Sequence, residues 1–168
     1  MMADRKTEIV AECMRQSESC LYTSTSLFLW LRAIRFWSRV WVVAPILLGG
    51  LAGFNVLQES TPPWVAATLT LVAGFFPAMY EALKLKGQAE EVGRYAAQFK
   101  TLQDRFRQTA TITAAGDLTT LEAEFSSLMD RMDAARAVSI TAPQRFFEAA
   151  QKQIKGGNYT FTVDETRS

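Results

Sequence analysis

The chain of 168 residues contains no histidine, and this absence removes the side chain that most often serves as a catalytic base or metal ligand. The usual serine and cysteine triads and most zinc sites need histidine, so they are excluded. The sequence also lacks the Walker A pattern and the GxGxxG and GxSxG patterns. We therefore expect no enzyme activity, no cofactor and no metal site.

The sequence also has no excess of positive or negative charge. Lysine and arginine number 18 against 17 aspartate and glutamate residues, which gives a net charge of +1. Neither terminus carries a basic or acidic tail, so we expect no nucleic-acid partner. Two carboxylate clusters, Glu90-Glu91 and Asp130 with Asp133, are interpreted as solvated helix faces rather than catalytic pairs.

Cysteine is scarce, with Cys13 and Cys20 as the only two. Seven residues apart on a helix, their Cα atoms would be about 10 Å apart, which is too far for a disulfide. We expect free thiols that pack as small apolar residues, in agreement with a cytoplasmic location. Redox sensing is the alternative, although no base or metal ligand accompanies them in the sequence.

Charged residues are absent from two long stretches, 40–57 and 62–80, which are 18 and 19 residues long. As helices they would reach about 27 and 28 Å, enough to cross the hydrocarbon core of a bilayer. The link between them, residues 58–61, is short, and Pro62-Pro63 suits a helix start. We predict a transmembrane hairpin (residues 40–80) with spans at about 40–57 and 62–80. The alternative is a soluble bundle in which both helices are buried on every side.

Positive charge lies on one side of the predicted hairpin. Arg32, Arg35 and Arg39 precede the first stretch, and Lys84 and Lys86 follow the second. By the positive-inside rule, we expect a multi-pass membrane protein with both termini in the cytoplasm. Aromatic and basic side chains near the predicted boundaries are expected to anchor it at the lipid interface: Trp30, Arg35, Trp37, Arg39, Trp41 and Trp64.

Residues 1–39 are predicted to form a long N-terminal helix, because apolar residues recur on one helical face and no proline occurs before Pro45. The segment from Leu27 to Trp37 mixes large apolar side chains with arginines. It has two interpretations. Either it lies along the inner membrane surface before the chain turns into the bilayer, or it packs against later cytoplasmic helices.

Residues 81–155 are predicted to form cytoplasmic helices. The apolar pattern continues without a break from the second span to Phe106. A loop around residues 114–116 follows, and Asp117 is expected to cap a helix whose apolar residues step three or four apart from Leu118 to Ala135. We expect this helix to fold back on its predecessor as an antiparallel pair.

A short last helix is expected to begin near Thr141 and Pro143 and to end at Gly156-Gly157. The tail, residues 156–168, is predicted to be extended, because residues 158–163 alternate between polar and apolar. The predicted fold class is therefore an all-α membrane protein, with a two-helix transmembrane hairpin and a cytoplasmic helical bundle.

Small residues recur four apart along both predicted spans. They are Gly49 and Gly53 in the first span, and Ala66, Thr70, Gly74 and Ala78 in the second. Such ridges let membrane helices approach closely, so we predict that they mediate helix packing and oligomerisation. The alternative is a ridge used only between the two helices of one chain.

Polar residues are rare in the predicted spans, and we interpret Asn55, Thr68 and Glu81 as candidate pore-lining residues. Glu81 would form a charged ring at a pore mouth if protomers assemble about an axis. Equally, it could pair with Lys84 or Arg39. Two helices cannot enclose a water path, so a channel requires a homo-oligomer or a partner chain.

Four segments of the sequence resemble the SLATT family of bacterial two-transmembrane effectors. They are SLFLWLR (26–32), PILLGGLAG (45–53), YEALKL (80–85) and the C-terminal PQRFFEAAQKQIKGGNY (143–159). The resemblance covers most of the chain, and its motifs are structural rather than catalytic.

The resemblance implies a membrane effector of prokaryotic conflict systems, which forms pores in the bacterial inner membrane and stops an infected cell. No added sensor domain is present in this sequence, so a separately encoded sensor or regulator would have to supply the trigger. The competing expectation is a membrane anchor or scaffold, in which the lipid-bound hairpin tethers the chain and the cytoplasmic helices recruit a partner.

Overall fold

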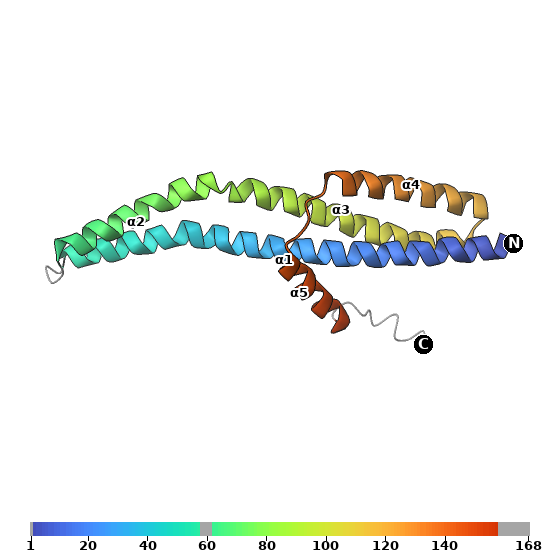
Figure 1. Ribbon diagram of the computed structural model, residues 1–168, viewed down its shortest axis with the longest axis horizontal. Helices are drawn as coiled ribbons and strands as arrows, with labels where there is room; N and C mark the ends of the chain where they lie inside the picture. The colour runs from blue at the N-terminus through green and yellow to red at the C-terminus, as the bar shows by residue number, and fades with distance from the viewer. Residues whose placement is uncertain (1, 58–61, 158–168) are drawn as a thin grey trace. The chain divides into compact units, whose positions relative to one another are not determined.

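The structure is a computed structural model that describes residues 2–57 and 62–157 (Figure 1). Within these ranges the side chains of Met2, Ala3, Ala52, residues 55–57, Pro63 and Ala66 are not described. The described residues are all-helical, with no strand. In chain order the elements are α1 (Met2–Leu57), α2 (Pro63–Ala82), α3 (Leu85–Thr111), the 3-10 turn η1 (Thr113–Ala115), α4 (Leu118–Val138) and α5 (Gln144–Lys155). The predicted extended tail, from residue 158, lies outside the described residues.

Helix α1 is a single helix of 56 residues, about 84 Å long at 1.5 Å per residue. It continues through Arg39 and Val40 without a turn, so the interpretation in which the chain turns before the first apolar stretch does not hold. Pro45 lies inside the helix. Proline has no amide hydrogen, so the Trp41 carbonyl lacks its usual helical donor.

Helix α2 begins at Pro63 with Pro62 before it, as predicted from the two prolines. The apolar pattern runs without a break from the second predicted span to Phe106, but the helix does not, because α2 ends at Ala82 and α3 begins at Leu85. Lys84 has a φ of 46° and is the one non-glycine residue with positive φ in the described part of the chain. The left-handed conformation at this residue ends α2, and the Lys84 carbonyl accepts the Gln88 amide at the start of α3.

The chain divides into two compact units. The first, called here the bundle unit, contains the residues up to Trp30 together with those from Val92 onward. The second, called the apolar unit, is Leu31–Glu91 and contains the rest of α1, α2 and the start of α3. The bundle unit is therefore built from two segments of sequence, and the apolar unit from one.

The bundle unit has an ordinary hydrophobic core, to which α1, α3, α4 and α5 each contribute. Phe106 and Leu121 are fully buried, and the apolar stripe predicted on α4 is buried at Leu128, Met132 and Ala135. The other buried apolar residues of this unit are Cys13, Cys20, Leu27, Val92, Tyr95, Ala96, Phe99, Leu102, Ala110 and Ala150. Figure 1 shows α3 and α4 side by side, joined through η1, as the predicted pair of helices.

Polar contacts fix how α1 sits against its neighbours in this unit. Arg5 forms an ion pair with Glu122 of α4, and farther along both helices Arg136 donates a hydrogen bond to Gln16 Oε1 at 3.3 Å. These two pairs advance in the same direction, so α1 and α4 run parallel. Ser17 Oγ donates to the Gln103 carbonyl of α3 at 3.1 Å.

The predicted N-cap of α4 is confirmed. The Asp117 carboxylate accepts the Thr120 amide at 3.0 Å and also accepts the Thr119 and Thr120 hydroxyls. Hydrogen bonds from Thr119 and then from Thr120 lower the pKa of this carboxyl below its usual value. Asp117 therefore stays ionised where it is needed to bind the unpaired amides of the first turn.

Both cysteines are free and buried, as predicted. Cys20 Sγ lies 3.3 Å from Met132 Sδ, so it faces α4. Burial raises the pKa of each thiol to about 11. The thiols stay protonated at neutral pH and act as small apolar core groups.

Candidate membrane-facing surface

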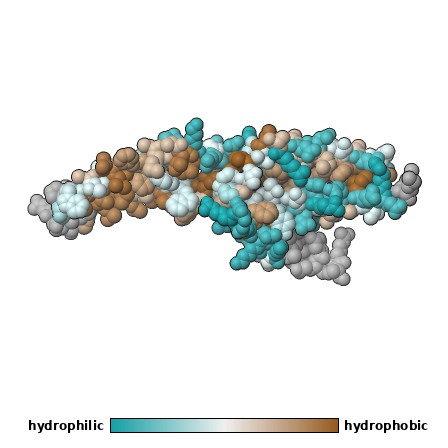
Figure 2. All heavy atoms as spheres, viewed as in Figure 1, coloured by the Kyte–Doolittle hydropathy of each residue, from teal (hydrophilic) through white to brown (hydrophobic). Residues whose placement is uncertain are grey.

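The apolar unit exposes most of its large apolar side chains. Beyond Ile34, no apolar residue of this unit is buried among the side chains that the structure describes. The exposed ones are Phe36, Trp37, Val42, Val43, Ile46, Leu47, Leu51, Phe54, Trp64, Leu71, Val72, Phe75, Met79 and Leu83. On the face seen in Figure 2, hydrophobic surface is gathered over α2 and the second half of α1. A water-soluble monomer rarely exposes an apolar patch of this extent.

One helical stretch of the described residues, Asp4–Leu51 within α1, is long and apolar enough to cross a membrane. Only 6% of its most apolar window is buried. A core helix of a soluble protein would have that window covered by other elements. Burial on every side, the soluble alternative for the first apolar stretch, is therefore not what the structure has.

Within the apolar unit, α1 and α2 touch through aromatic side chains. The Trp41 and Phe76 rings lie 5.1 Å apart between centroids, inclined by 54°. Beside this contact an open groove of about 650 Å³ is lined by α1 residues from Trp41 to Ile46 and by α2 residues from Thr70 to Glu81. The two helices therefore pack against each other while leaving apolar surface between them uncovered.

The predicted small-residue ridges are not covered by the chain's own helices where the structure describes them. Gly49, Gly53 and Gly74 are exposed, and a Cβ placed on any of them would meet no atom within 4 Å. A second groove, of about 660 Å³, runs along α2 and includes three ridge positions, Thr70, Gly74 and Ala78. The small size of the three glycines therefore serves no close helix contact within one chain. The Ala66 side chain lies outside the described residues.

The candidate pore-lining residues differ in their surroundings. Thr68 is exposed and its hydroxyl donates to the Trp64 carbonyl at 2.7 Å, so its proton is satisfied within α2. Glu81 is exposed at the end of α2 and forms no ion pair with Arg39 or Lys84. The ion pair of Glu81 with Lys84 or Arg39, which the sequence left open, is thus absent from the described part of the chain. The Asn55 side chain is outside the described residues.

The predicted interface anchors fall into two groups. Trp37 and Trp64 are well exposed, at 55% and 68%, and Arg35 and Arg39 are exposed as well. Trp30 and Trp41 are half-buried, the latter by its contact with Phe76. The exposed tryptophans lie near opposite ends of the apolar stretches, which is the placement that two lipid interfaces favour.

No cluster of residues suited to hold a metal ion occurs in the ranges 2–57 and 62–157. The Asp130 and Asp133 side chains are exposed, and Asp133 lies 3.9 Å from Arg136.

The sequence did not predict the turn at Leu83-Lys84 or the two grooves. The turn has no glycine or proline to signal it, and the grooves depend on how α1 and α2 pack.

No family model matches the chain, and no curated protein or solved structure shows significant similarity to it.

Proposed function

We propose that this protein is a membrane effector that inserts as a two-helix hairpin, oligomerises and permeabilises the bacterial inner membrane. The second half of α1 and the whole of α2 would be the two spans, with both termini in the cytoplasm. The bundle unit would then serve as the cytoplasmic control and assembly module.

The observation that carries this proposal is the exposed apolar surface of the apolar unit. Leu71, Phe75 and Ile46 are 67%, 60% and 68% exposed. Exposing apolar surface to water costs roughly 25 cal/mol per Å², so a surface of this extent needs lipid or another protein to cover it. Lipid tails would cover the large side chains at no such cost.

The glycines support assembly beyond a simple anchor. Gly53 and Gly74 face open space in a single chain. In a bilayer, small residues at this spacing are the common basis of close contact between helices of different chains. Because two helices cannot enclose water, a conducting state requires several copies around an axis, or a partner chain. Exposed Glu81, with no ion pair in the described chain, would then line one mouth of the pore.

The biological setting in this proposal comes from the SLATT resemblance, which remains a prediction. It suggests a role in antiviral conflict, with the protein held inactive until a separately encoded regulator acts. The charge pattern fits this orientation, because Arg32, Arg35, Arg39, Lys84 and Lys86 would all meet the cytoplasmic face.

Dye release from liposomes tests the proposal. Wild-type protein, together with the regulator encoded beside it, should release an entrapped dye. Gly53→Leu and Gly74→Leu should each slow release by at least about tenfold, equivalent to about 1.4 kcal/mol of lost association. The matched control is Val72→Phe, because Val72 lies about 200° around α2 from Gly74 and would face lipid.

The proposal fails if wild-type protein leaves liposomes tight under every activating condition. It also fails as an oligomeric pore if Val72→Phe slows release as strongly as Gly74→Leu. Depolarisation of cells that express the same variants provides the second readout.

A membrane scaffold is the second candidate, and the separately packed core of the bundle unit favours it. In this case the apolar unit only tethers the bundle unit, which recruits a partner. Exchange of residues 40–80 for an unrelated hairpin of equal length would then preserve function. Loss of function in that chimaera, with its membrane insertion intact, would exclude the scaffold.

A further inference from the structure

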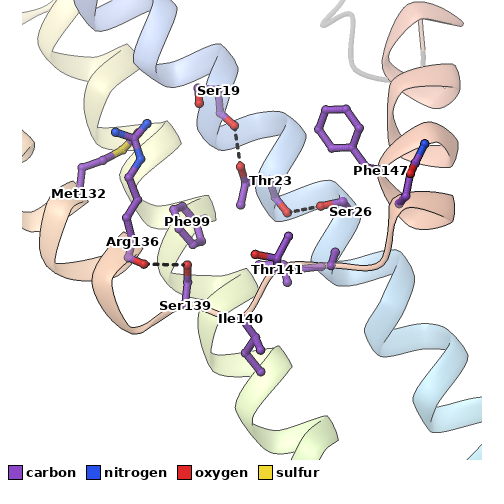
Figure 3. A pocket seen from close by; sticks show the side chains of 13 residues that line it. Ser19, Thr23, Ser26, Phe99, Met132, Arg136, Ser139, Ile140, Thr141 and Phe147 are labelled. Carbon is purple, nitrogen blue, oxygen red and sulfur yellow. Dashed lines mark hydrogen bonds between the residues drawn. The ribbon is translucent and has the colours of Figure 1, made fainter.

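A cavity of about 500 Å³ lies within the bundle unit (Figure 3). Its walls come from α1, α3 and α4, from the connection between α4 and α5, and from α5. This volume falls within the range of about 300–1,000 Å³ typical of sites for small organic molecules. None of the residues assigned above to the membrane surface lines it.

Hydroxyl groups make up much of the polar lining. Ser26 donates its proton to the Thr23 carbonyl at 2.8 Å, and Thr23 donates to the Ser19 carbonyl at 3.0 Å. Ser139 likewise donates to the Arg136 carbonyl at 3.3 Å. Figure 3 shows these bonds beside the cavity. Since their protons are used, the three hydroxyl oxygens can only accept hydrogen bonds from a ligand.

Arg136 is the only charged side chain among the described residues that line the cavity. It reaches from α4 toward α1, where it donates to Gln16 Oε1 at 3.3 Å, and it lies 3.9 Å from Asp133. Both contacts are long, and a guanidinium has five N–H donors, so most of its donors stay available. A carboxylate or phosphate would take them in a bidentate arrangement.

The remaining walls are apolar and partly aromatic. Phe99 projects from α3 and is almost fully buried, whereas Phe147 projects from α5 and is 46% exposed. In Figure 3 these rings come from different sides of the cavity. Leu27, Met132 and Ile140 complete the apolar lining. A flat ring would gain contact area between such walls and would cover the exposed face of Phe147.

We propose that this cavity binds a small aromatic anion, a carboxylate or phosphate attached to a ring that also carries an O–H or N–H donor. The acid group binds Arg136, the ring packs between Phe99 and Phe147, and the ring donor reaches the hydroxyl oxygens of Thr23, Ser26 or Ser139. The site lies within the bundle unit, so this binding does not depend on membrane permeation.

Calorimetric titration of the full chain in detergent micelles tests this site with 4-hydroxybenzoate as the probe. Saturable binding should appear with a dissociation constant near or below about 1 mM. Benzoate should bind more weakly because it lacks the hydroxyl donor, and acetate should bind at least about tenfold more weakly because it lacks the ring.

Two arginines of the same helix make the matched comparison. Arg136→Gln should weaken binding of 4-hydroxybenzoate by at least about tenfold, whereas Arg131→Gln, with the same loss of charge outside the cavity, should leave it unchanged. Phe147→Ala should weaken the aromatic probes and leave acetate unaffected. Circular dichroism verifies that each variant keeps its helix content.

Three results would overturn the proposal. They are the absence of saturable binding by 4-hydroxybenzoate, equal weakening by Arg131→Gln and Arg136→Gln, and binding of acetate as tight as that of the aromatic acids. The liposome assay is a separate measurement, so the binding site and the pore succeed or fail independently.

Discussion

Phe106 and Phe75 show that the two units differ in how far they bury the same type of side chain. Phe106 of the bundle unit has no exposed surface, whereas Phe75 of the apolar unit is 60% exposed. On α3 polar residues separate the apolar ones, so the apolar residues form one stripe that α1 and α4 cover. On α2 apolar residues occur all around the helix, and a single neighbour cannot cover them. The width of the apolar face therefore decides whether a helix completes its burial within its own chain.

The largest expected difference comes from truncating these two rings. Phe106→Ala should lower the free energy of unfolding by about 3–5 kcal/mol, because it removes buried contacts and leaves a cavity. Phe75→Ala should change it by less than about 1 kcal/mol in detergent, because micelles already cover that ring. Guanidinium unfolding followed by circular dichroism measures both. Similar losses for the two variants would mean that the units do not differ as described.

A charge placed on the surface of the apolar unit tests its contact with lipid. Leu71→Lys, in the middle of α2, should disfavour insertion by about 3–4 kcal/mol, the difference between the contributions of lysine and leucine. The fraction of the protein that stays in the membrane after alkaline extraction should therefore fall. Ala134→Lys on the exposed face of α4 is the control and should leave that fraction unchanged. Full retention of Leu71→Lys would exclude α2 as a span.

The two units also end their helices differently. After α5 the chain uses Gly157 at a φ of 81°, whereas after α2 it uses Lys84 at 46°. A side chain in the left-handed region costs about 1–2 kcal/mol, a cost that glycine avoids. Lys84→Gly should thus stabilise the turn by up to about 1 kcal/mol, and Lys84→Val should destabilise it. Amide exchange of Leu85 to Gln88 should slow in the first variant and accelerate in the second. The opposite order would show that the turn is not strained.

The smallest expected effect concerns the cap of α4. Asp117→Ala should lower the melting temperature slightly, and Asp117→Asn should retain most of the stability because an amide also caps helices. The folded-state pKa of Asp117 is lowered, so its contribution is fully present above the unfolded pKa of about 3.9 and is lost progressively as the pH falls from there toward the folded-state pKa. The difference in melting temperature between wild type and Asp117→Ala should therefore narrow as the pH falls from 7 to 3. A constant difference between them would contradict the role of the carboxylate.

Much of the bundle unit follows from local patterns. The three-and-four spacing on α4 predicted Leu128, Met132 and Ala135 as buried, and Asp117 and Pro63 marked helix starts that the structure confirms. These features depend on residues close in sequence, so a sequence contains the information directly.

Other features depend on distant parts of the chain. Leu83, Lys84 and Leu85 all favour helix, and the packed structure overrides that preference with a turn. The cavity combines Ser19, Phe99 and Phe147, whose separation in sequence hides their common wall. Periodicity indicates which face of a helix is buried, but not where neighbouring helices leave a gap.

The division of the bundle unit into two segments of sequence sets an order of events during synthesis. The residues up to Trp30 leave the ribosome first, but α3 and α4, which pack against them, follow 55 to 108 residues later, as counted from Trp30 to Leu85 and to Val138. At about 5–20 residues per second, that delay is roughly 3–20 s. The apolar stretches emerge within this interval, so under the proposed function the nascent chain would meet the membrane insertion machinery before the core of the bundle unit can close. Newly made protein therefore passes through a stage in which the first helix lacks the helices that it packs against. A chaperone that binds apolar helices could bind it during this stage.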